Sequence, residues 1–138
     1  MPIDIDEFIE AGRSRLPGLL GVQIDEIEAG HVRMHLQLRP ELLAPNGYLH
    51  AGTVVALADS TCGYGCIASL PDGATGFTTI ELKTNFLATA LKGAIACESR
   101  LVHGGRTTQV WDATVIDESG KTLALFRCTQ LLVYAPAR

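Results

Sequence analysis

Residues 49–68 read LHAGTVVALADSTCGYGCIA, a strongly apolar stretch that carries one carboxylate, Asp59. The turn-forming residues 45–47 (PNG) precede it and residues 50–52 (HAG) open it, which is typical of the start of a helix. Its apolar residues spread around a helical projection instead of forming one stripe. We therefore predict a helix that is buried on most sides, and such a helix needs a sheet curved around it.

Length and charge restrict the class of protein. The chain has 138 residues, which suits a single domain over residues 1–138. Its formal net charge of −4 argues against nucleic acid as a partner. The acidic start lacks the apolar segment of a signal peptide, and Asp59, His50 and three glycines disfavour the run at 49–68 as a membrane helix. We expect a soluble, cytoplasmic protein that does not bind membranes.

Four cysteines occupy positions 62, 66, 97 and 128. No two of them form a C-x-x-C pair, and their spacing fits no zinc site. Cys62 and Cys66 lie one helical turn apart in the predicted helix, so we expect both to be small buried side chains. The sequence predicts neither a metal site nor a disulfide framework.

The flanking sequence predicts one short helix and six strands. Residues 4–16 have apolar positions at helical spacing, and residues 17–18 (PG) are expected to end this helix. Alternation and turn residues predict strands over residues 20–28, 31–38, 76–87, 94–102, 106–117 and 121–134. The last four strands are expected to form a meander, with residues 103–105 as the turn between two of them. Within the strand over residues 76–87, alternation is expected to place Thr79 and Leu82 on opposite faces of the sheet. The fold class is α+β, with a curved antiparallel sheet wrapped around a long central helix.

The order of these elements and one motif resemble a known family. The motif is NGYLHAG at residues 46–52, followed by Asp59 in the same helix, with Gly-Arg at 105–106 further along. It is similar to the PaaI-like branch of the hotdog-fold acyl-CoA thioesterases, over roughly residues 17–135. The resemblance implies a hotdog fold, hydrolysis of an acyl-CoA with an aryl or short-to-medium acyl group, and no cofactor. It also implies a homodimer that often pairs into a homotetramer.

The resemblance further implies catalytic roles. The backbone N–H of Ala51 polarises the thioester carbonyl, and Asp59 acts as nucleophile or general base. Thr79, on the strand after the helix, orients water or is only a β-forming residue. The family's Asn or Gln before the histidine is replaced by Ala44 here, so Asn46 either takes over its contact or only favours the turn.

Four more positions follow from the same resemblance. Gly52 and Gly63 lie near the substrate. Arg106 meets a phosphate of coenzyme A or is a solvated strand end. His50 orients the turn or acts as a general base, and the orienting role is favoured.

The chemistry itself favours a shared site. An attacked thioester carbonyl becomes an oxyanion, and the first turn of a helix offers unpaired N–H groups at its positive end. Ala51 and Asp59 are eight residues apart, or about 12 Å along a helix axis, so one helix cannot easily bring both to one carbonyl. Two antiparallel helices can, each supplying the other's acid. The alternatives are a protein that binds acyl-CoA without hydrolysis, and a hydratase or dehydratase; Asp59 favours the thioesterase.

Overall fold

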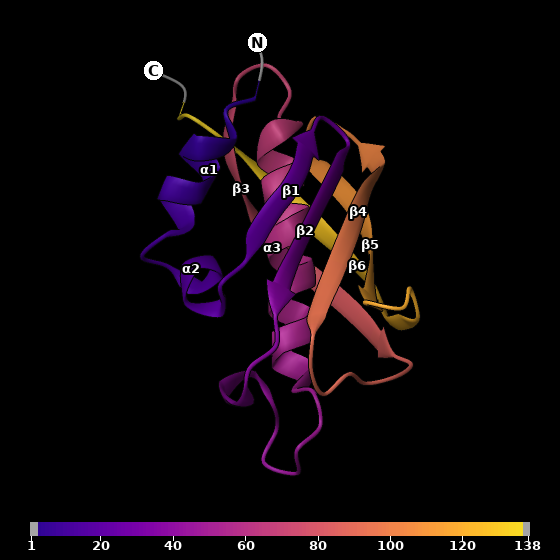
Figure 1. Ribbon diagram of the computed structural model, residues 1–138. Coiled ribbons are helices and arrows are strands. Elements are labelled where there is room, and N and C mark those ends of the chain that lie inside the picture. The colour runs from indigo at the N-terminus through magenta and orange to yellow at the C-terminus, as the bar shows by residue number, and fades with distance from the viewer. Residues whose placement is uncertain (1–2, 137–138) are drawn as a thin grey trace.

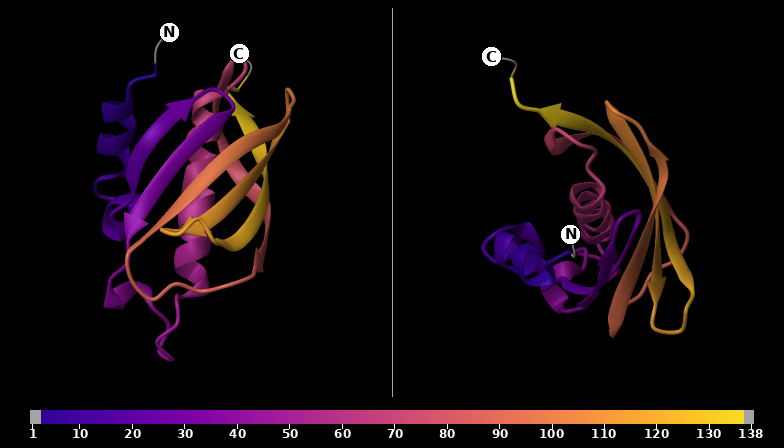
Figure 2. Two further views of the ribbon diagram at one scale, coloured as in Figure 1. Left: turned by 45° about the vertical axis from the view of Figure 1, so that its right-hand side comes forward. Right: turned by 90° about the horizontal axis from the view of Figure 1, so that it is seen from above.

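The computed structural model describes residues 3–136 and is built around the long helix α3, Ala51–Ala68. A six-stranded antiparallel sheet curves around this helix, and α1 and α2 lie near the edge formed by β1 (Figures 1 and 2). The other helices are α1 (Ile5–Gly12), α2 (Leu16–Leu20) and the short 3-10 helix η1 (Pro40–Leu42). The strands are β1 (Gln23–Glu28), β2 (His31–Gln37), β3 (Ala74–Phe86), β4 (Ala94–Gly104), β5 (Thr108–Asp117) and β6 (Thr122–Tyr134). The predicted α+β class, with a curved antiparallel sheet around a central helix, is confirmed.

The order of the strands differs from the predicted meander. It is β1-β2-β4-β5-β6-β3, so β3 pairs with the last strand and β4 pairs with β2. The loop after β3 passes the N-terminal end of α3, where the Thr89 hydroxyl accepts a hydrogen bond from the Leu49 N–H. It then reaches the end of β2, where the Gly93 carbonyl accepts a hydrogen bond from the Leu38 N–H. The prediction of a four-strand meander was wrong because neighbours in sequence need not be neighbours in a sheet wrapped around a helix. In the described part of the chain, β3 is therefore an edge strand without a partner on its outer side.

The N-terminal segment forms two helices, so the single helix expected over residues 4–16 is a wrong prediction. Arg15 is extended and separates α1 from α2. Pro17 lies in the first turn of α2 instead of ending a helix, because first-turn N–H groups have no helical partner and a proline there loses nothing. Gly21 ends α2 with a left-handed φ of 76°, so β1 begins at Gln23 rather than at residue 20.

Strand β4 also extends further at its C-terminal end than expected. The predicted turn over residues 103–105 is shifted, since β4 continues to Gly104 after an irregularity in its pairing with β5. Gly105 closes the turn by donating its N–H to the Thr108 carbonyl at 2.9 Å. The remaining boundaries agree within two residues. Among the described residues, no helix is long and apolar enough to cross a membrane.

The central helix is packed closely against the sheet. Nine of its 18 residues are buried, as its apolar composition predicts, and all four cysteines of the chain are free and buried. Gly65 allows the closest contact, because a Cβ there would lie 2.6 Å from the fully buried indole of Trp111. The Trp111 N–H donates to Gln109, whose amide donates to the Ser69 carbonyl just after the helix. The indole is thus fixed in place beneath the helix.

A β-bulge changes which residues of β3 face the helix. Thr79 pairs with Gln130 and Glu81 pairs with Thr129, so Ile80 is an extra residue in β3. Leu82 pairs with Cys128, which shares the buried face of β6 with Gln130. Thr79 and Leu82 therefore both lie on the inner face of the sheet, and the predicted strict alternation across them is wrong. The bulge turns the Thr79 side chain toward α3.

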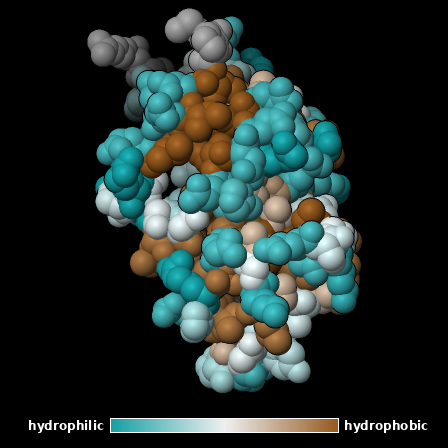
Figure 3. Space-filling view, in the orientation of Figure 1, coloured by the Kyte–Doolittle hydropathy of each residue, from teal (hydrophilic) through white to brown (hydrophobic). Residues whose placement is uncertain are grey.

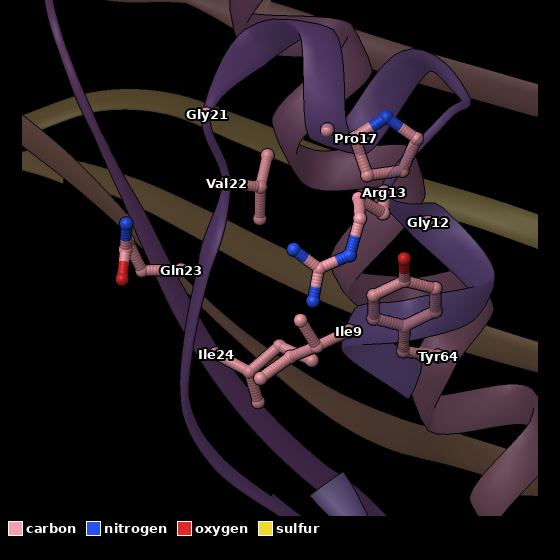
Figure 4. A pocket seen from close by; sticks show the side chains of 10 residues that line it. Ile9, Gly12, Arg13, Pro17, Gly21, Val22, Gln23, Ile24 and Tyr64 are labelled. Atoms are coloured by element: carbon pink, nitrogen blue, oxygen red, sulfur yellow. The ribbon is translucent and has the colours of Figure 1, made fainter. Parts of the chain in front are cut away.

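The N-terminal helices pack over Tyr64 of α3. Phe8 meets the Tyr64 ring edge-on with a centroid distance of 5.3 Å, and a side chain at Gly12 would lie 2.5 Å from the Tyr64 hydroxyl. Between α1, α2 and β1 they leave a hollow of about 220 Å³, bordered by Arg13 and Tyr64 (Figure 4). The Arg13 guanidinium pairs with Glu10 at 2.9 Å, so the charge at this hollow is already satisfied.

Candidate active site

The acid predicted from the sequence lies in the middle of α3, on the side facing β3. Asp59 is half-buried, and the Thr79 hydroxyl lies 3.3 Å from its Oδ1. Burial raises the pKa of Asp59 above its usual value, and the hydrogen bond from Thr79 lowers that pKa in part. The structure thus brings together Asp59 and Thr79, two of the residues selected from the sequence.

Gln130 of β6 joins this pair and was missed by the sequence analysis. Its side chain is fully buried, and its Oε1 lies 2.7 Å from Thr79 Oγ1. The signal was available, because Gln130 continues the inward-facing row that contains Phe126 and Cys128. A polar residue in a buried row needs a partner, and this one finds it in Thr79.

The hydroxyl of Thr79 carries only one hydrogen and cannot donate to both neighbours at once. If it donates to Gln130, Asp59 receives no hydrogen bond from it. If the Gln130 amide is turned so that Nε2 faces Thr79, then Gln130 donates to Thr79 and Thr79 donates to Asp59. Turning the amide places Oε1 instead of Nε2 beside Cys128 Sγ, 3.4 Å away, and forms a chain of hydrogen bonds that ends on the carboxylate.

The N-terminus of α3 presents a free backbone donor. His50 is the N-cap, and its Nδ1 accepts the Gly52 N–H at 2.7 Å, which fits the orienting role expected for it. The Thr53 and Val54 N–H groups both reach the His50 carbonyl. Within residues 3–136, the N–H of Ala51 has no acceptor, and Ala51 is exposed. A free N–H at the positive end of a helix is suited to bind a carbonyl oxygen that gains negative charge.

The contacts of Asn46 and Gly63 lie in the turn before α3 and against β3, respectively. The Asn46 side chain accepts the Tyr48 N–H at 3.1 Å within the turn before α3, so the bond that it makes is the turn-forming one. Gly63 is buried one turn after Asp59, and a Cβ there would lie 3.0 Å from the Phe77 ring. Gly63 therefore allows β3 to approach the helix.

Arg106 lies at the opposite end of α3 from Ala51. It is exposed in the loop between β4 and β5, and its carbonyl accepts a hydrogen bond from the Tyr134 hydroxyl. The nearby Gln109 amide donates to the Ser69 carbonyl at 2.9 Å, which places this loop beside the C-terminal end of the helix. Within one chain, Arg106 and the Ala51 N–H cannot contact the same small group.

Comparison with known proteins gives the family. The profile of the Thioesterase superfamily matches residues 46–124 of this chain. The 1,4-dihydroxy-2-naphthoyl-CoA hydrolase of Listeria monocytogenes is 32% identical over 110 residues, which cover 80% of this chain and 89% of that protein. The acyl-coenzyme A thioesterase PaaI of Escherichia coli is 26% identical over 109 residues, covering 78% and 75% of the two chains.

Solved structures agree on the fold. A mutant of thioesterase PA1618 from Pseudomonas aeruginosa has a TM-score of 0.91 and 24% identity, over 98% of this chain and 97% of that chain. The E. coli PaaI protein has a TM-score of 0.78 and 22% identity, over 85% and 83%. At these identities the likeness shows the fold alone, and it confirms the hotdog fold. The profile match and the 32% identity to the Listeria protein show that this chain belongs to the thioesterase superfamily, as a hotdog-fold thioester hydrolase of the PaaI-like group.

Proposed function

We propose that the protein hydrolyses acyl-CoA thioesters at a site shared by two copies of the chain. The Ala51 N–H of one copy binds the carbonyl oxygen, and the partner subunit's Asp59 acts on the carbonyl carbon. The observation that carries this proposal is that the free N–H and the half-buried acid sit on one straight helix, eight residues apart. That spacing is about 12 Å, too far for both groups to reach one carbonyl within a single chain.

The free edge of the sheet supports a dimer. Among residues 3–136, the 13-residue strand β3 has no neighbour on its outer side. Three of its apolar side chains are 56%, 41% and 50% exposed: Ile80, Leu82 and Phe86. Long apolar edge strands are templates for pairing with another strand. Because Thr79 of the same strand contacts Asp59, a second copy at this edge would lie next to the acid. A twofold axis there makes the two α3 helices antiparallel.

The same twofold symmetry would bring Arg106 into the shared site. It lies beside the C-terminal end of its own α3, so in an antiparallel pair it would come to the N-terminal end of the partner helix. A guanidinium there would meet the phosphates of coenzyme A while the thioester sits at Ala51. The proposal extends to a tetramer that pairs two such dimers.

The reaction needs a base or a nucleophile and an oxyanion donor. As a base, Asp59 takes a proton from water, the water oxygen attacks the carbonyl carbon, and Ala51 N–H binds the oxyanion. Collapse breaks the C–S bond, and the thiolate leaves and takes up the proton, giving a free acid and coenzyme A. As a nucleophile, Asp59 displaces the thiolate to form an anhydride, which water then hydrolyses. Thr79 orients the acid in both routes.

The acyl group is proposed to be aryl or of short-to-medium length. One relative is named for a naphthoyl-CoA substrate and another as an acyl-coenzyme A thioesterase. The first name supports an aryl acyl group on coenzyme A, and the second supports an acyl-CoA substrate without specifying the acyl group.

The test is a panel of acetyl-, octanoyl-, benzoyl- and crotonyl-CoA with the purified protein. A thiol reagent should report release of coenzyme A, with kcat/KM of about 10⁴ M⁻¹s⁻¹ or more for the best substrate. Binding without thiol release would contradict hydrolysis and indicate a binding protein. Loss of enoyl absorbance without thiol release would instead indicate a hydratase.

A further inference from the structure

We infer that the acyl group of the substrate lies in an apolar groove between α2 and the N-terminal half of α3. This inference rests on the proposed function. The groove has a volume of about 430 Å³. Its wall includes Leu16, Leu19, Leu42, His50, Gly52 and Ala56.

The position of the groove follows the chemistry of the thioester. Its carbonyl oxygen is proposed to sit at the Ala51 N–H, and the first carbon of the acyl group is bonded directly to the carbonyl carbon. The acyl group must therefore begin within a few ångströms of Ala51. His50 and Gly52, the neighbours of Ala51 on both sides, line the groove, so it opens where the acyl group begins.

The wall formed by α2 is apolar and held in place. Leu16 and Leu19 are 53% and 70% exposed, and Figure 3 shows apolar side chains over the lower part of α2. The Arg39 guanidinium donates to the carbonyls of Leu19 at 2.6 Å and Leu20 at 3.2 Å, which fixes the C-terminal end of this short helix. An apolar occupant would remove both leucines from water, which is favourable in proportion to the area covered.

The charges near the groove define the substrate class. Arg39 and Glu41 are the charged residues along its wall, and they lie 3.6 Å apart, with Arg39 also bound to the α2 carbonyls. The Arg39 guanidinium donates to these carbonyls, and its charge is offset in part by the exposed Glu41 carboxylate beside it, so the wall carries no net charge for a carboxylate or an ammonium group to pair with. The structure assigns to this groove an uncharged apolar acyl group, either an aryl ring or a medium-length alkyl chain, and disfavours dicarboxylic or amino-acyl groups.

Two variants test the groove by selectivity. Leu19→Ala removes part of an exposed wall and Ala56→Phe fills the space, and each should lower the ratio of kcat/KM for octanoyl-CoA to that for acetyl-CoA. The expected loss is about tenfold or more, since each methylene group in an apolar pocket is worth at least that factor. Val102→Ala is the control: Val102 on β4 is an exposed apolar side chain, as Leu19 is (52% and 70% exposed), and it lies outside the groove. A ratio unchanged in both test variants would overturn the inference.

A binding measurement separates this inference from the proposed function. The S-octyl thioether of coenzyme A has no carbonyl and cannot be hydrolysed. Its addition to the wild-type protein should shift the methyl NMR signals of Leu16 and Leu19 but not those of Val102. If other signals shift instead and acetyl-CoA is still hydrolysed, the inference about the groove would be overturned while the proposed function would stand. Shifts at both leucines without hydrolysis of any thioester would support the groove and contradict the proposed function.

Discussion

At the scale of single residues, the Thr79 hydroxyl sets how readily Asp59 ionises. Burial raises the pKa of this carboxyl and the Thr79 hydrogen bond lowers it in part, so Thr79→Val should leave burial unopposed and raise this pKa further. If Asp59 works in its ionised form, activity rises with pH through its pKa. The acidic limb of the kcat/KM profile should therefore move to higher pH in Thr79→Val.

The matched control for this shift is Thr78→Val. Thr78 is exposed on the opposite face of the same strand, so its replacement changes β3 without touching the acid. An acidic limb that stays in place in Thr79→Val, or moves equally in both variants, would show that Thr79 does not act on Asp59.

Asp59 should be needed for turnover, and its ionised form should lower the free energy of unfolding. Asp59→Asn is expected to lower kcat by about two orders of magnitude or more, the scale for loss of a base or nucleophile. The pKa of Asp59 is raised above its usual 3.8 in the folded chain, so the native state holds this proton more tightly than the unfolded state. The contribution of Asp59 to the free energy of unfolding is therefore greatest below pH 3.8. It falls as pH rises from 3.8 through the raised pKa of the folded state, and it stays lower at neutral pH.

Thermal unfolding at two pH values checks the predicted effect of Asp59 on stability. Asn cannot ionise, so Asp59→Asn should have a higher Tm than the wild type at pH 7 and a similar Tm below pH 4. Near wild-type turnover in the variant would contradict the catalytic role, and a lower Tm at pH 7 would contradict the sign of the pKa shift.

The sequence identified part of this site for a physical reason. A lone carboxylate in an apolar helix needs a function or a partner, and this requirement is enough to single out Asp59. Gln130 was missed because its neighbours in sequence are strongly strand-forming, so it was taken as one more strand position although it continues the inward-facing row of Phe126 and Cys128. The inward turn of Thr79 could not be predicted, since the bulge at Ile80 is a property of two paired strands.

At the scale of elements, the contact between α3 and the sheet depends on one small residue. A Cβ at Gly65 would lie 2.6 Å from Trp111, whose indole is fully buried and tied to Gln109. Gly65→Ala should therefore lower the free energy of unfolding by about 1–3 kcal/mol through overpacking, despite the better helix propensity of alanine.

Urea denaturation provides the measurement, with Gly76→Ala as the control. A Cβ at Gly76 meets nothing within 4 Å, so that variant should change stability by less than about 0.5 kcal/mol. Equal midpoints for the two variants would mean that the helix does not pack on Trp111 as described.

The elements themselves were largely predictable, and their arrangement was less so. Period-two alternation and turn residues locate strands, because both are local properties of the chain. The pairing of β3 with β6 joins segments about 50 residues apart, and no local pattern encodes it. The break between α1 and α2 was missed because Pro17 was taken as a stop signal, although proline is equally suited to the first turn of a helix.

At the scale of the whole molecule, the edge strand β3 should hold two copies together. Ile80 is 56% exposed in the single chain, so Ile80→Lys should leave the fold intact but place a charge where the partner strand pairs. Analytical ultracentrifugation should show a shift toward monomer, with kcat/KM falling in parallel. Val102→Lys, at a position 52% exposed on β4, is the control that should stay dimeric. Full activity from a monomeric Ile80→Lys would exclude a shared site.

The most direct test of the shared site mixes two inactive variants. Asp59→Asn removes the acid, and Ala51→Pro removes the N–H. Proline suits the first helical position, and His50 before it already has a ψ of 132°, within the range that precedes proline. In each mixed dimer one site carries both defects and the other carries neither. Subunit exchange, followed by mass, should restore up to about half of the wild-type activity per mixed dimer. Confirmed exchange without any return of activity would contradict the account, because Ala51 and Asp59 would then serve the site of one subunit.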